Sequence, residues 1–426
     1  MEKQEITPFT GYQKLVVLIL TLTQFTVILD FMIMSPLGDM LMKSMSLKPS
    51  AFGIAVSAYA FSAGISGLLT AGFADKFDRK KLLLFFYIGF IAGTVLCGMA
   101  HTYPLLLAAR IITGLFGGVI GSISMAIITD LFALQQRGRV MGFVQMGFGA
   151  SQVLGIPIGL YLANHWGWEI PFFLTAALAG IIAIIIIARL KPVTAHLLIQ
   201  HDRSAFKHLL HTVARRDYRI GFAATALLSI GGFMMMPFGS AFAINNLHVS
   251  NEQLPILFMI AGVSSLLVMP IIGRLSDKIS KFRLFAIATI WMMVMCVLYT
   301  NLAVTPFWLV VVFNILMMMG VMSRMIPSSA LTSGVPAMED RGAFMSINAS
   351  MQQIAGGVAA AASGLIVVQQ SKYSPLEHYD TVGYVIVVIS ICSILLMKRV
   401  NDMVNRKAKA NPAIIKQDEV VISEGF

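Results

Sequence analysis

About twelve apolar segments, each close to the length of a bilayer crossing, follow one another along this chain. A helix needs about 20 mostly apolar residues to cross the hydrocarbon core, and it satisfies its backbone hydrogen bonds internally, as lipid requires. With 57% hydrophobic and 12% charged residues, the 426-residue chain has too little charge to cover a water-soluble surface. The sequence therefore predicts an all-α membrane protein of about twelve transmembrane helices. The expected spans cover approximately residues 14–36, 51–74, 82–100, 104–130, 140–164, 170–190, 219–244, 254–275, 282–301, 306–329, 343–369 and 382–397.

The positive charges lie almost entirely on one side of these spans. With the N-terminus placed in the cytoplasm, only Lys43, Lys48 and Lys372 of the 31 Lys and Arg residues fall outside, and only Arg110 and Arg324 fall within spans. Loops rich in Lys and Arg stay in the cytoplasm, so we expect a multi-pass protein of the cell (inner) membrane with both termini cytoplasmic. Because the net charge of +11 resides in these loops, we expect no nucleic-acid partner.

A polar connector divides the spans into two groups of six. Short loops recur in both groups: Asp75 is matched by Asp277 after 202 residues, and the Arg-Gly dipeptide at 137–138 by that at 341–342 after 204 residues. Two parallel repeats with a site between them near mid-membrane are typical of secondary transporters, whereas a channel has less support. The expected parts are a cytoplasmic N-terminus (1–13), an N-terminal six-helix half (14–190), a cytoplasmic connector (191–217), a C-terminal six-helix half (218–398) and a cytoplasmic C-terminal tail (399–426).

The loop after the second span carries a recognisable pattern. Residues 71–80 read Ala-Gly-Phe-Ala-Asp-Lys-Phe-Asp-Arg-Lys and resemble the signature of the major facilitator superfamily, roughly Gly-x-Leu-Ala-Asp-Arg-x-Gly-Arg-Lys, although Ala71 and Asp78 replace its glycines. The resemblance covers essentially the whole chain and implies the major facilitator fold. It also implies a gating loop whose Asp and Arg latch the halves together in the outward-open state. The residues that keep the pattern in the two copies of this loop are Asp75, Arg79, Lys80, Gly273 and Asp277.

Two further motifs resemble those of proton antiporters in this family. Residues 110–114 read Arg-Ile-Ile-Thr-Gly and resemble the family's Arg-x-x-Gln-Gly motif, with Thr113 in place of Gln, which implies a link between Arg110 and proton coupling. Residues 155–159 resemble a degenerate antiporter motif, as in 12-span drug:proton antiporters and sugar-efflux permeases. The resemblance also implies a monomer. The residues that carry this second motif are Gly155, Pro157 and Gly159.

Asp30 is an ionisable side chain within the first span, where a charge is costly and normally faces the protein interior or a water-filled path. It lies six residues before Pro36, which is roughly 9 Å at about 1.5 Å per residue. Arg110 lies six residues after Pro104, at a similar depth, so the two side chains are predicted to meet. In one interpretation a movement of Arg110 away from Asp30 loads a proton onto Asp30. In the other, the pair is static and only holds spans one and four together.

Polar residues in other spans are candidates for a substrate cavity. Arg324 lies about 18 residues after Pro306, where it either attracts an anionic substrate or extends its long stem to the surface. Asn314 takes roughly the place of Arg110 in the second repeat, so proton coupling is expected in the N-terminal half alone. Amides within spans orient polar ligands, but they also bond neighbouring helices. The candidates are Gln24, Gln145, Gln152, Asn314, Arg324 and Gln352.

These patterns favour proton-coupled efflux of small organic molecules by alternating access, with a small-molecule substrate, protons and membrane lipid as partners. A proton-coupled uptake symporter for a metabolite is an alternative that the same fold supports. A lipid or lysolipid transporter is another, because the very apolar spans hold many of the 28 methionines. The sequence contains no nucleotide-binding loop, no spacing of metal ligands and no catalytic motif, so we expect neither enzyme activity nor a cofactor or metal.

Overall fold

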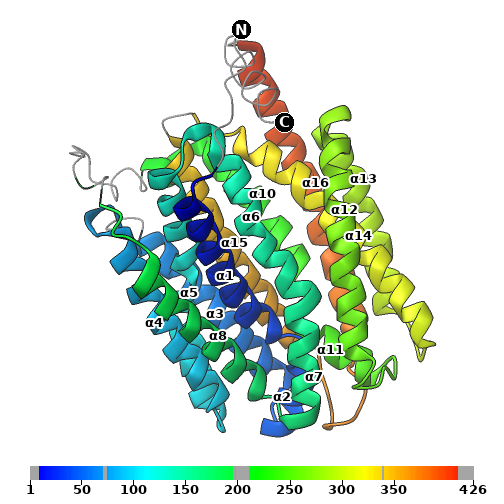
Figure 1. Cartoon of the computed structure of the whole chain (residues 1–426). Coiled ribbons are helices and arrows are strands. Elements are labelled where there is room, and N and C mark those ends of the chain that lie inside the picture. The colour runs from blue at the N-terminus through cyan, green and yellow to red at the C-terminus, as the bar shows by residue number, and fades with distance from the viewer. Residues whose placement is uncertain (1–8, 71–73, 195–196, 198–210, 338–339, 411–426) are drawn as a thin grey trace.

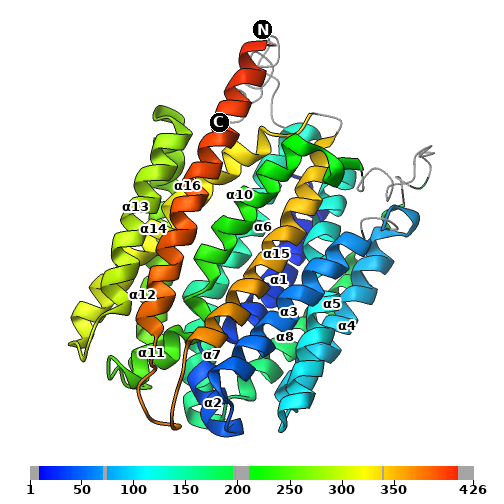
Figure 2. The ribbon, with the colours of Figure 1, turned by 180° about the vertical axis from the view of Figure 1, so that it is seen from behind.

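The structure of this chain, a computed structural model, is a bundle of long helices (Figures 1 and 2). It describes residues 9–70, 74–194, 197, 211–337 and 340–410. Apart from one isolated bridge between Val368 and Glu377, these residues form no strand, which confirms the prediction of an all-α protein. The expected cytoplasmic N-terminus, connector and C-terminal tail lie partly outside the described residues.

The helices follow the predicted order of spans, with short helices at some of the turns. The first group consists of α1 (Gly11–Ile33), α2 (Gly38–Met45), α3 (Pro49–Thr70), η1 (Ala74–Lys76), α4 (Arg79–Gly98), α5 (Tyr103–Leu131), α6 (Leu134–Ala150), η2 (Ser151–Gly155), α7 (Ile156–Trp166) and α8 (Ile170–Arg189). The second group consists of α10 (Arg216–Phe233), η4 (Met236–Phe238), α11 (Gly239–Asn245), α12 (Leu254–Lys278), α13 (Lys281–Thr300), α14 (Phe307–Ser333), α15 (Arg341–Ile366) and α16 (Tyr379–Ala410).

Eleven helical segments of the described chain are long and apolar enough to cross a membrane. They account for every expected span except residues 343–369, whose place α15 takes. α15 is less apolar because it carries Asn, Gln and Ser side chains, yet it runs alongside α3 through the middle of the bundle (Figure 2). A polar helix fits there because its neighbours, rather than lipid, surround much of its surface.

Two of the expected spans are present as single helical segments, Gln136–Trp166 and Arg216–Asn245, but each departs from a regular α-helix part of the way along. Span 140–164 consists of α6 and α7 joined by the π-helical turn η2, in which Ile156 N–H bonds the carbonyl of Ser151. Pro157 follows directly. Proline has no backbone N–H to donate, and its ring crowds the carbonyl of the preceding turn, so the wider π-helical turn relieves this steric clash. Span 219–244 departs in another way: α10 ends at Phe233, and the 3₁₀-helical turn η4, which contains Pro237, precedes α11.

The two groups of helices meet along seams of small residues. At the α3 and α15 seam, a Cβ on Gly53 would lie 2.6 Å from the carbonyl oxygen of Ala360, and Ser57 Oγ donates to the carbonyl of Gly357 at 2.8 Å. At the second seam, a Cβ on Gly262 of α12 would lie 3.0 Å from the backbone of Gln152 in η2. Glycine allows these helices to approach closely in the absence of bulky side chains.

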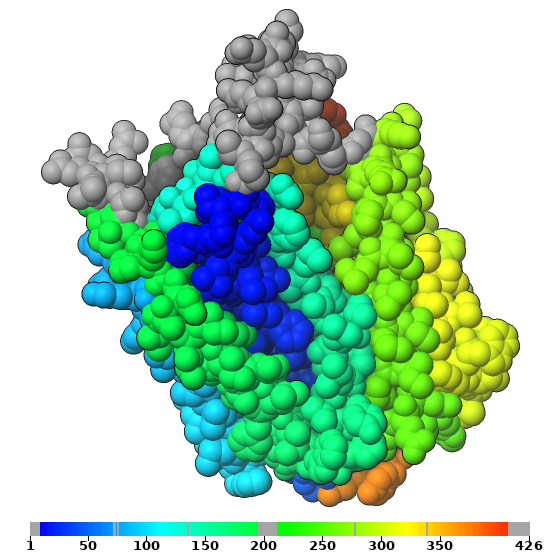
Figure 3. Space-filling view, in the orientation of Figure 1, coloured from blue at the N-terminus to red at the C-terminus, as the bar shows by residue number. Residues whose placement is uncertain are grey.

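The two ends of the bundle differ. At the end that carries α2, α7 and α11 (bottom of Figure 1), one hydrophobic core combines side chains of both halves, from Leu29 to Ile386. At the opposite end, where α1 begins, each half has a core of its own. Figure 3 shows the surface hollowed between α6 and α12 toward that opposite end. The halves are therefore joined at the α2 end and spread at the other.

A polar cluster, which we name the α2 clasp, ties the halves together at the closed end. Asn245 Nδ2 of α11 donates to Asp39 Oδ1 of α2 at 2.6 Å, and Lys43 Nζ lies 2.7 Å from Asp39 Oδ2 and 3.1 Å from Asn245 Oδ1. Ser240 Oγ also donates to the carbonyl of Ser35, at 2.9 Å. Hydrogen bonds to charged groups are the stronger ones, so the α2 clasp adds a polar lock to the shared core.

Candidate functional site

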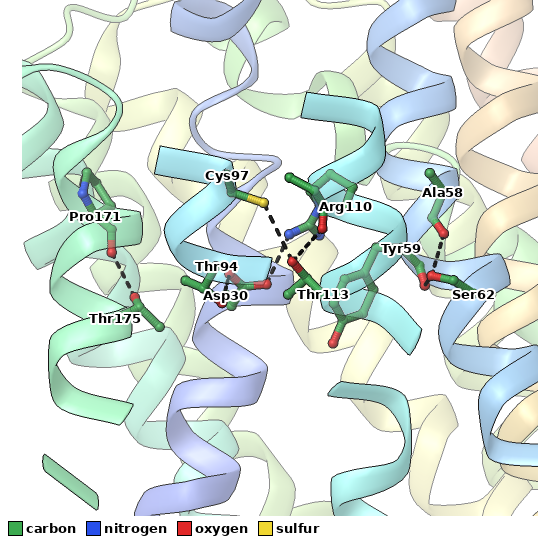
Figure 4. A network of polar contacts seen from close by, with 11 residues as sticks. Asp30, Ala58, Tyr59, Ser62, Thr94, Cys97, Arg110, Thr113, Pro171 and Thr175 are labelled. Atoms are coloured by element: carbon green, nitrogen blue, oxygen red, sulfur yellow. Dashed lines mark hydrogen bonds and ion pairs between the residues drawn. The ribbon is translucent and has the colours of Figure 1, made fainter. Parts of the chain in front are cut away.

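Asp30 and Arg110 meet inside the N-terminal half, as their depths predict. Arg110 Nη1 of α5 donates to Asp30 Oδ2 of α1 at 3.0 Å, and both side chains are 0% exposed (Figure 4). A buried pair of opposite charge is held by mutual attraction, whereas either charge alone would be costly. The prediction that the two side chains meet is confirmed, and their role in transport remains a prediction.

Two further residues, which the sequence did not point to, complete this site. Thr94 Oγ1 of α4 donates to Asp30 Oδ1 at 3.1 Å, and the Arg110 guanidinium lies over the ring of Tyr59 of α3, 4.5 Å from its centroid. Arg110 Nε and Nη2 have no hydrogen-bond partner in the described part of the chain. Helices α1, α3, α4 and α5 thus each supply one side chain to a fully enclosed cluster.

Aromatic rings connect this cluster to the interface between the halves. The ring of Tyr59 lies 5.2 Å from that of Phe31, which follows Asp30 on α1, and Phe31 lies 6.2 Å from Phe233 of α10 in the other half. We name Tyr59, Phe31 and Phe233 the aromatic bridge. A small cavity lies beside it between the halves. The residues that line this cavity are Phe31, Ser35, Val56, Ala60, Phe233, Met236, Pro237, Gln353, Gly356 and Ala360.

Arg324 of α14 occupies an enclosed position in the C-terminal half. Its side chain is 2% exposed, so it does not extend to the surface, and that sequence-based alternative is wrong. Nη2 donates to the carbonyl of Leu228 of α10 over a long 3.4 Å, and Nε has no partner in the described residues. No carboxylate within the described residues lies within ion-pair distance of it.

The amide candidates are scattered. Gln24 and Gln352 are half-buried, Gln145 is exposed on α6, and Gln152 lies at the contact of η2 with α12. Asn314 is half-buried, and its Oδ1 has no partner among the described residues. The small cavity is lined by Gln353, the neighbour of Gln352, and by none of the six candidates named from the sequence.

The first copy of the gating loop is anchored within its own half. Arg79 Nε lies 3.4 Å from Asp130 Oδ2 at the end of α5, and Arg79 Nη1 donates to the carbonyl of Ala74 at 3.0 Å. Lys80 Nζ donates to the carbonyl of Ile187 of α8 at 2.9 Å. The side chains of the other expected members, Asp75 and Asp277, lie outside the described part of the structure. Gly273 is within α12, and a Cβ there would meet nothing within 4 Å.

The antiporter-like motif packs α7 onto α1. A Cβ on Gly155 would lie 2.7 Å from Leu29 Cδ1, and one on Gly159 would lie 2.8 Å from Ile33 Cδ1. Pro157, between them, is buried. Leu29 precedes Asp30, so this motif fixes the segment of α1 that carries the ion pair. No group of three or more His, Cys, Asp or Glu that could hold a metal occurs in the part of the chain that is described.

Comparison with known proteins places this arrangement among transporters. The chain is 26% identical over 383 residues to the MFS-type transporter YbcL of Bacillus subtilis (strain 168), covering 89% of this chain and 94% of YbcL. It is 22% identical over 286 residues to Multidrug resistance protein 2 of the same organism, covering 65% of this chain and 71% of the relative.

Known structures and family profiles agree with these relatives. A bacterial homologue of the human lysosomal transporter Spinster, solved in an inward-facing conformation, superimposes with a TM-score of 0.71 at 16% identity, covering 94% of this chain and 99% of that one. The sequence profile of the Major Facilitator Superfamily matches residues 20–220 and 221–420. The profile matches each half of the chain once, and the helical fold is that of the Spinster homologue. The chain belongs to the Major Facilitator Superfamily of transporters.

Proposed function

We propose that this transporter exports small organic molecules in exchange for protons, by alternating access. The observation that carries the proposal is the enclosed pair of Asp30 and Arg110, because an ionisable group buried within spans normally serves transport or proton transfer. Asp30 is adjacent in sequence to Phe31, which lines the cavity between the halves. The similarity to a probable sugar efflux transporter of Mannheimia succiniciproducens, 25% identical over 255 residues, supports export as the direction.

The proposed proton step acts on the hydrogen bonds of Asp30. In the ionised state its two oxygens accept from Arg110 Nη1 and from Thr94 Oγ1. A proton bound at Oδ2 neutralises the carboxylate and removes the attraction that ties α1 to α5, while Arg110 keeps its contact with the Tyr59 ring. α1 is then free to shift at Phe31, so that proton binding changes the wall of the cavity.

We further propose that the α2 end faces the outside of the cell (inner) membrane and that both termini are cytoplasmic, as the distribution of Lys and Arg indicates. The shared core and the α2 clasp then close the external side in this structure. In the outward-open state the clasp would part, and the segments that carry Asp75 (η1) and Asp277 (the last turn of α12) would close the cytoplasmic side. The ion pair of Arg79 with Asp130 would hold the ends of α4 and α5 in place for that closure.

The experiment is proton flux in everted membrane vesicles with an acid interior, scored for a panel of small amphipathic dyes and drugs. An exported compound enters such vesicles as protons leave, so its addition raises the luminal pH, which a pH-sensitive fluorophore reports. We expect this signal in the wild type and its loss in Asp30→Asn. Glu377→Gln, which removes an exposed carboxylate remote from the spans' interior, is the matched control and should behave as the wild type.

Two results would contradict the proposal. A proton signal of equal size in Asp30→Asn would remove Asp30 from the coupling step. Compound-driven proton entry into vesicles of native orientation, with no signal in everted ones, would instead indicate an uptake symporter.

A further inference from the structure

Arg324 is a lone cation in the interior of the C-terminal half. Its side chain is 2% exposed, and it lies where α14 faces α10. A guanidinium offers five N–H donors and is not deprotonated in proteins, so it cannot avoid the cost of burial by losing its charge. Burial of a charge is costly unless it is paired and hydrogen-bonded.

The surroundings of Arg324 satisfy only a small part of that guanidinium. The carbonyl of Leu228 accepts one bond of 3.4 Å, and Nε has no partner in the described residues. No carboxylate and no aromatic ring of the described chain lies against it, in contrast with Arg110, which has both. Nε of Arg324 therefore lacks an acceptor among the described residues, and the positive charge lacks a carboxylate.

The part of α10 that faces Arg324 carries no side chain. The α10 residues opposite Arg324 are Gly231 and Gly232, and a Cβ on Gly232 would meet only Arg324 Nη2, at 3.2 Å. Gly232 lies one helical turn before Met236, which lines the cavity between the halves, and both are partly exposed. The cavity has a volume of about 10 Å³ in this conformation, which holds about one water molecule, so a larger group joined to an acceptor at Arg324 fits only in a state in which the halves have moved apart.

We propose that Arg324 binds the carboxylate of an organic monoanion and that this anion is the transported substrate. A guanidinium matches a carboxylate with two parallel hydrogen bonds, and one uncompensated positive charge suits one negative charge. The cavity walls beyond Gly232 are mainly apolar, with Phe31, Phe233 and Met236, so they suit an aromatic or aliphatic body attached to the carboxylate. The inference names the substrate class and rests on the proposed function as an exporter.

The closing experiment compares two probes of the same shape, 2-naphthoate and 2-naphthamide, by their stabilisation of the detergent-purified full-length protein in thermal unfolding. At a fixed ligand concentration, a bound ligand raises the apparent stability by an amount that grows with the logarithm of its affinity. We expect the wild type to prefer the carboxylate by about tenfold or more in Kd, since hydrogen bonds to charged groups exceed neutral ones. Arg324→Gln should remove the preference, and Arg324→Lys should retain part of it.

A second pair of variants fills the proposed site from inside. Gly232→Asp places a carboxylate beside Arg324 Nη2, to which a Cβ at this position would already lie within 3.2 Å. Gly232→Asp should abolish the preference for 2-naphthoate. Gly232→Asn introduces a side chain of nearly the same size without the charge, and it should weaken the binding of 2-naphthoate and 2-naphthamide to the same extent. This pair keeps the test decisive if Arg324→Gln folds poorly.

The inference is overturned if 2-naphthoate fails to stabilise the wild type more than 2-naphthamide does, or if the preference survives in Arg324→Gln. Asp30→Asn separates this inference from the proton-coupling proposal, because it should keep the carboxylate preference while losing proton flux. Absence of proton flux in the wild type, with the carboxylate preference intact, would contradict proton coupling and leave Arg324 as the anion site of a transporter with another energy source.

Discussion

Arg110 and Arg324 are both enclosed by helices, one in each half of the bundle, yet their partners differ. Arg110 bonds Asp30 at 3.0 Å and lies over the ring of Tyr59. Arg324 has one long bond to a backbone carbonyl and an Nε without a partner in the described residues. The first site is neutral as a whole, although Arg110 Nε and Nη2 have no hydrogen-bond partner in the described residues; the second carries an uncompensated charge.

The difference indicates a division of labour between two halves that share a fold. A complete ion pair holds its helices until something neutralises one member, which suits the exchange of a proton. A lone cation gains its partner only from outside the chain, which suits the binding of a substrate. The aromatic bridge of Tyr59, Phe31 and Phe233 runs from the Arg110 site to α10, the helix whose Leu228 carbonyl accepts from Arg324, and we expect it to carry movement between the two sites.

The sharpest way to break the comparison is to substitute Arg110. Arg110→Met leaves Asp30 as an unpaired buried charge, so we expect a loss of about 3–5 kcal/mol in the free energy of unfolding. Thermal and denaturant unfolding of the detergent-purified protein would measure it. A loss below about 1 kcal/mol would show that the pair does not stabilise the N-terminal half.

Neutralising both members of the pair tests whether the loss arises from an orphaned charge. The double variant Asp30→Asn with Arg110→Met should regain about 1–3 kcal/mol relative to the sum of the two single changes, because contacting residues couple. The same unfolding measurements on all four proteins give this coupling. Strict additivity would mean that Asp30 and Arg110 act independently in the folded protein.

The ring beneath Arg110 has no counterpart at Arg324 in the described chain, and its contribution can be isolated. Tyr59→Leu should cost about 1–2 kcal/mol beyond lost packing, since the cation loses the face of the ring. Tyr59→Phe keeps that face and should leave stability near the wild-type value. The cost of Tyr59→Leu should shrink when Arg110 is already Met, which unfolding of the double variant would show.

The smallest effect on stability is expected at Arg324. Arg324→Met removes a buried charge that has no partner, so the free energy of unfolding should stay within about 1 kcal/mol of wild type or increase. The carboxylate preference should nevertheless disappear, as the binding measurement would report. A loss as large as that of Arg110→Met would erase the contrast between the two arginines.

The sequence predicted the N-terminal site better than the C-terminal one, for geometric reasons. Asp30 and Arg110 could be paired because each lies the same number of residues from a proline at a span end, and helical rise converts that count into depth. Thr94 and Tyr59 could not be predicted, because which helices adjoin, and with which faces, depends on packing between segments distant in sequence.

The remaining differences concern rotation and breaks of helices. Gln352 and Gln353 differ by about 100° around α15, so the choice between them depends on a rotation that apolar periodicity leaves open when a helix is buried on most sides. The irregular turns at Pro157 and Pro237 depend on whether nearby groups can form hydrogen bonds with the backbone carbonyls that proline leaves without a donor. The burial of Arg324 depends on Gly231 and Gly232, which are 92 or more residues away in the chain.

The buried charges of the two halves also give the transporter an electrical property. The charges of Asp30 and Arg110 cancel. Without substrate or bound proton, the charges of Asp30, Arg110 and Arg324 therefore sum to the single positive charge of Arg324. A bound monoanion reduces the sum to zero, whereas a proton on Asp30 with Arg324 empty raises it to two. In the proposed cycle the export step then moves no net charge of these groups, and the return step moves two positive charges inward. A membrane potential, negative inside, favours that return by about 2.3 kcal/mol per charge per 100 mV for a full crossing. Voltage therefore acts on the protonated carrier without substrate, and not on the carrier that holds the substrate.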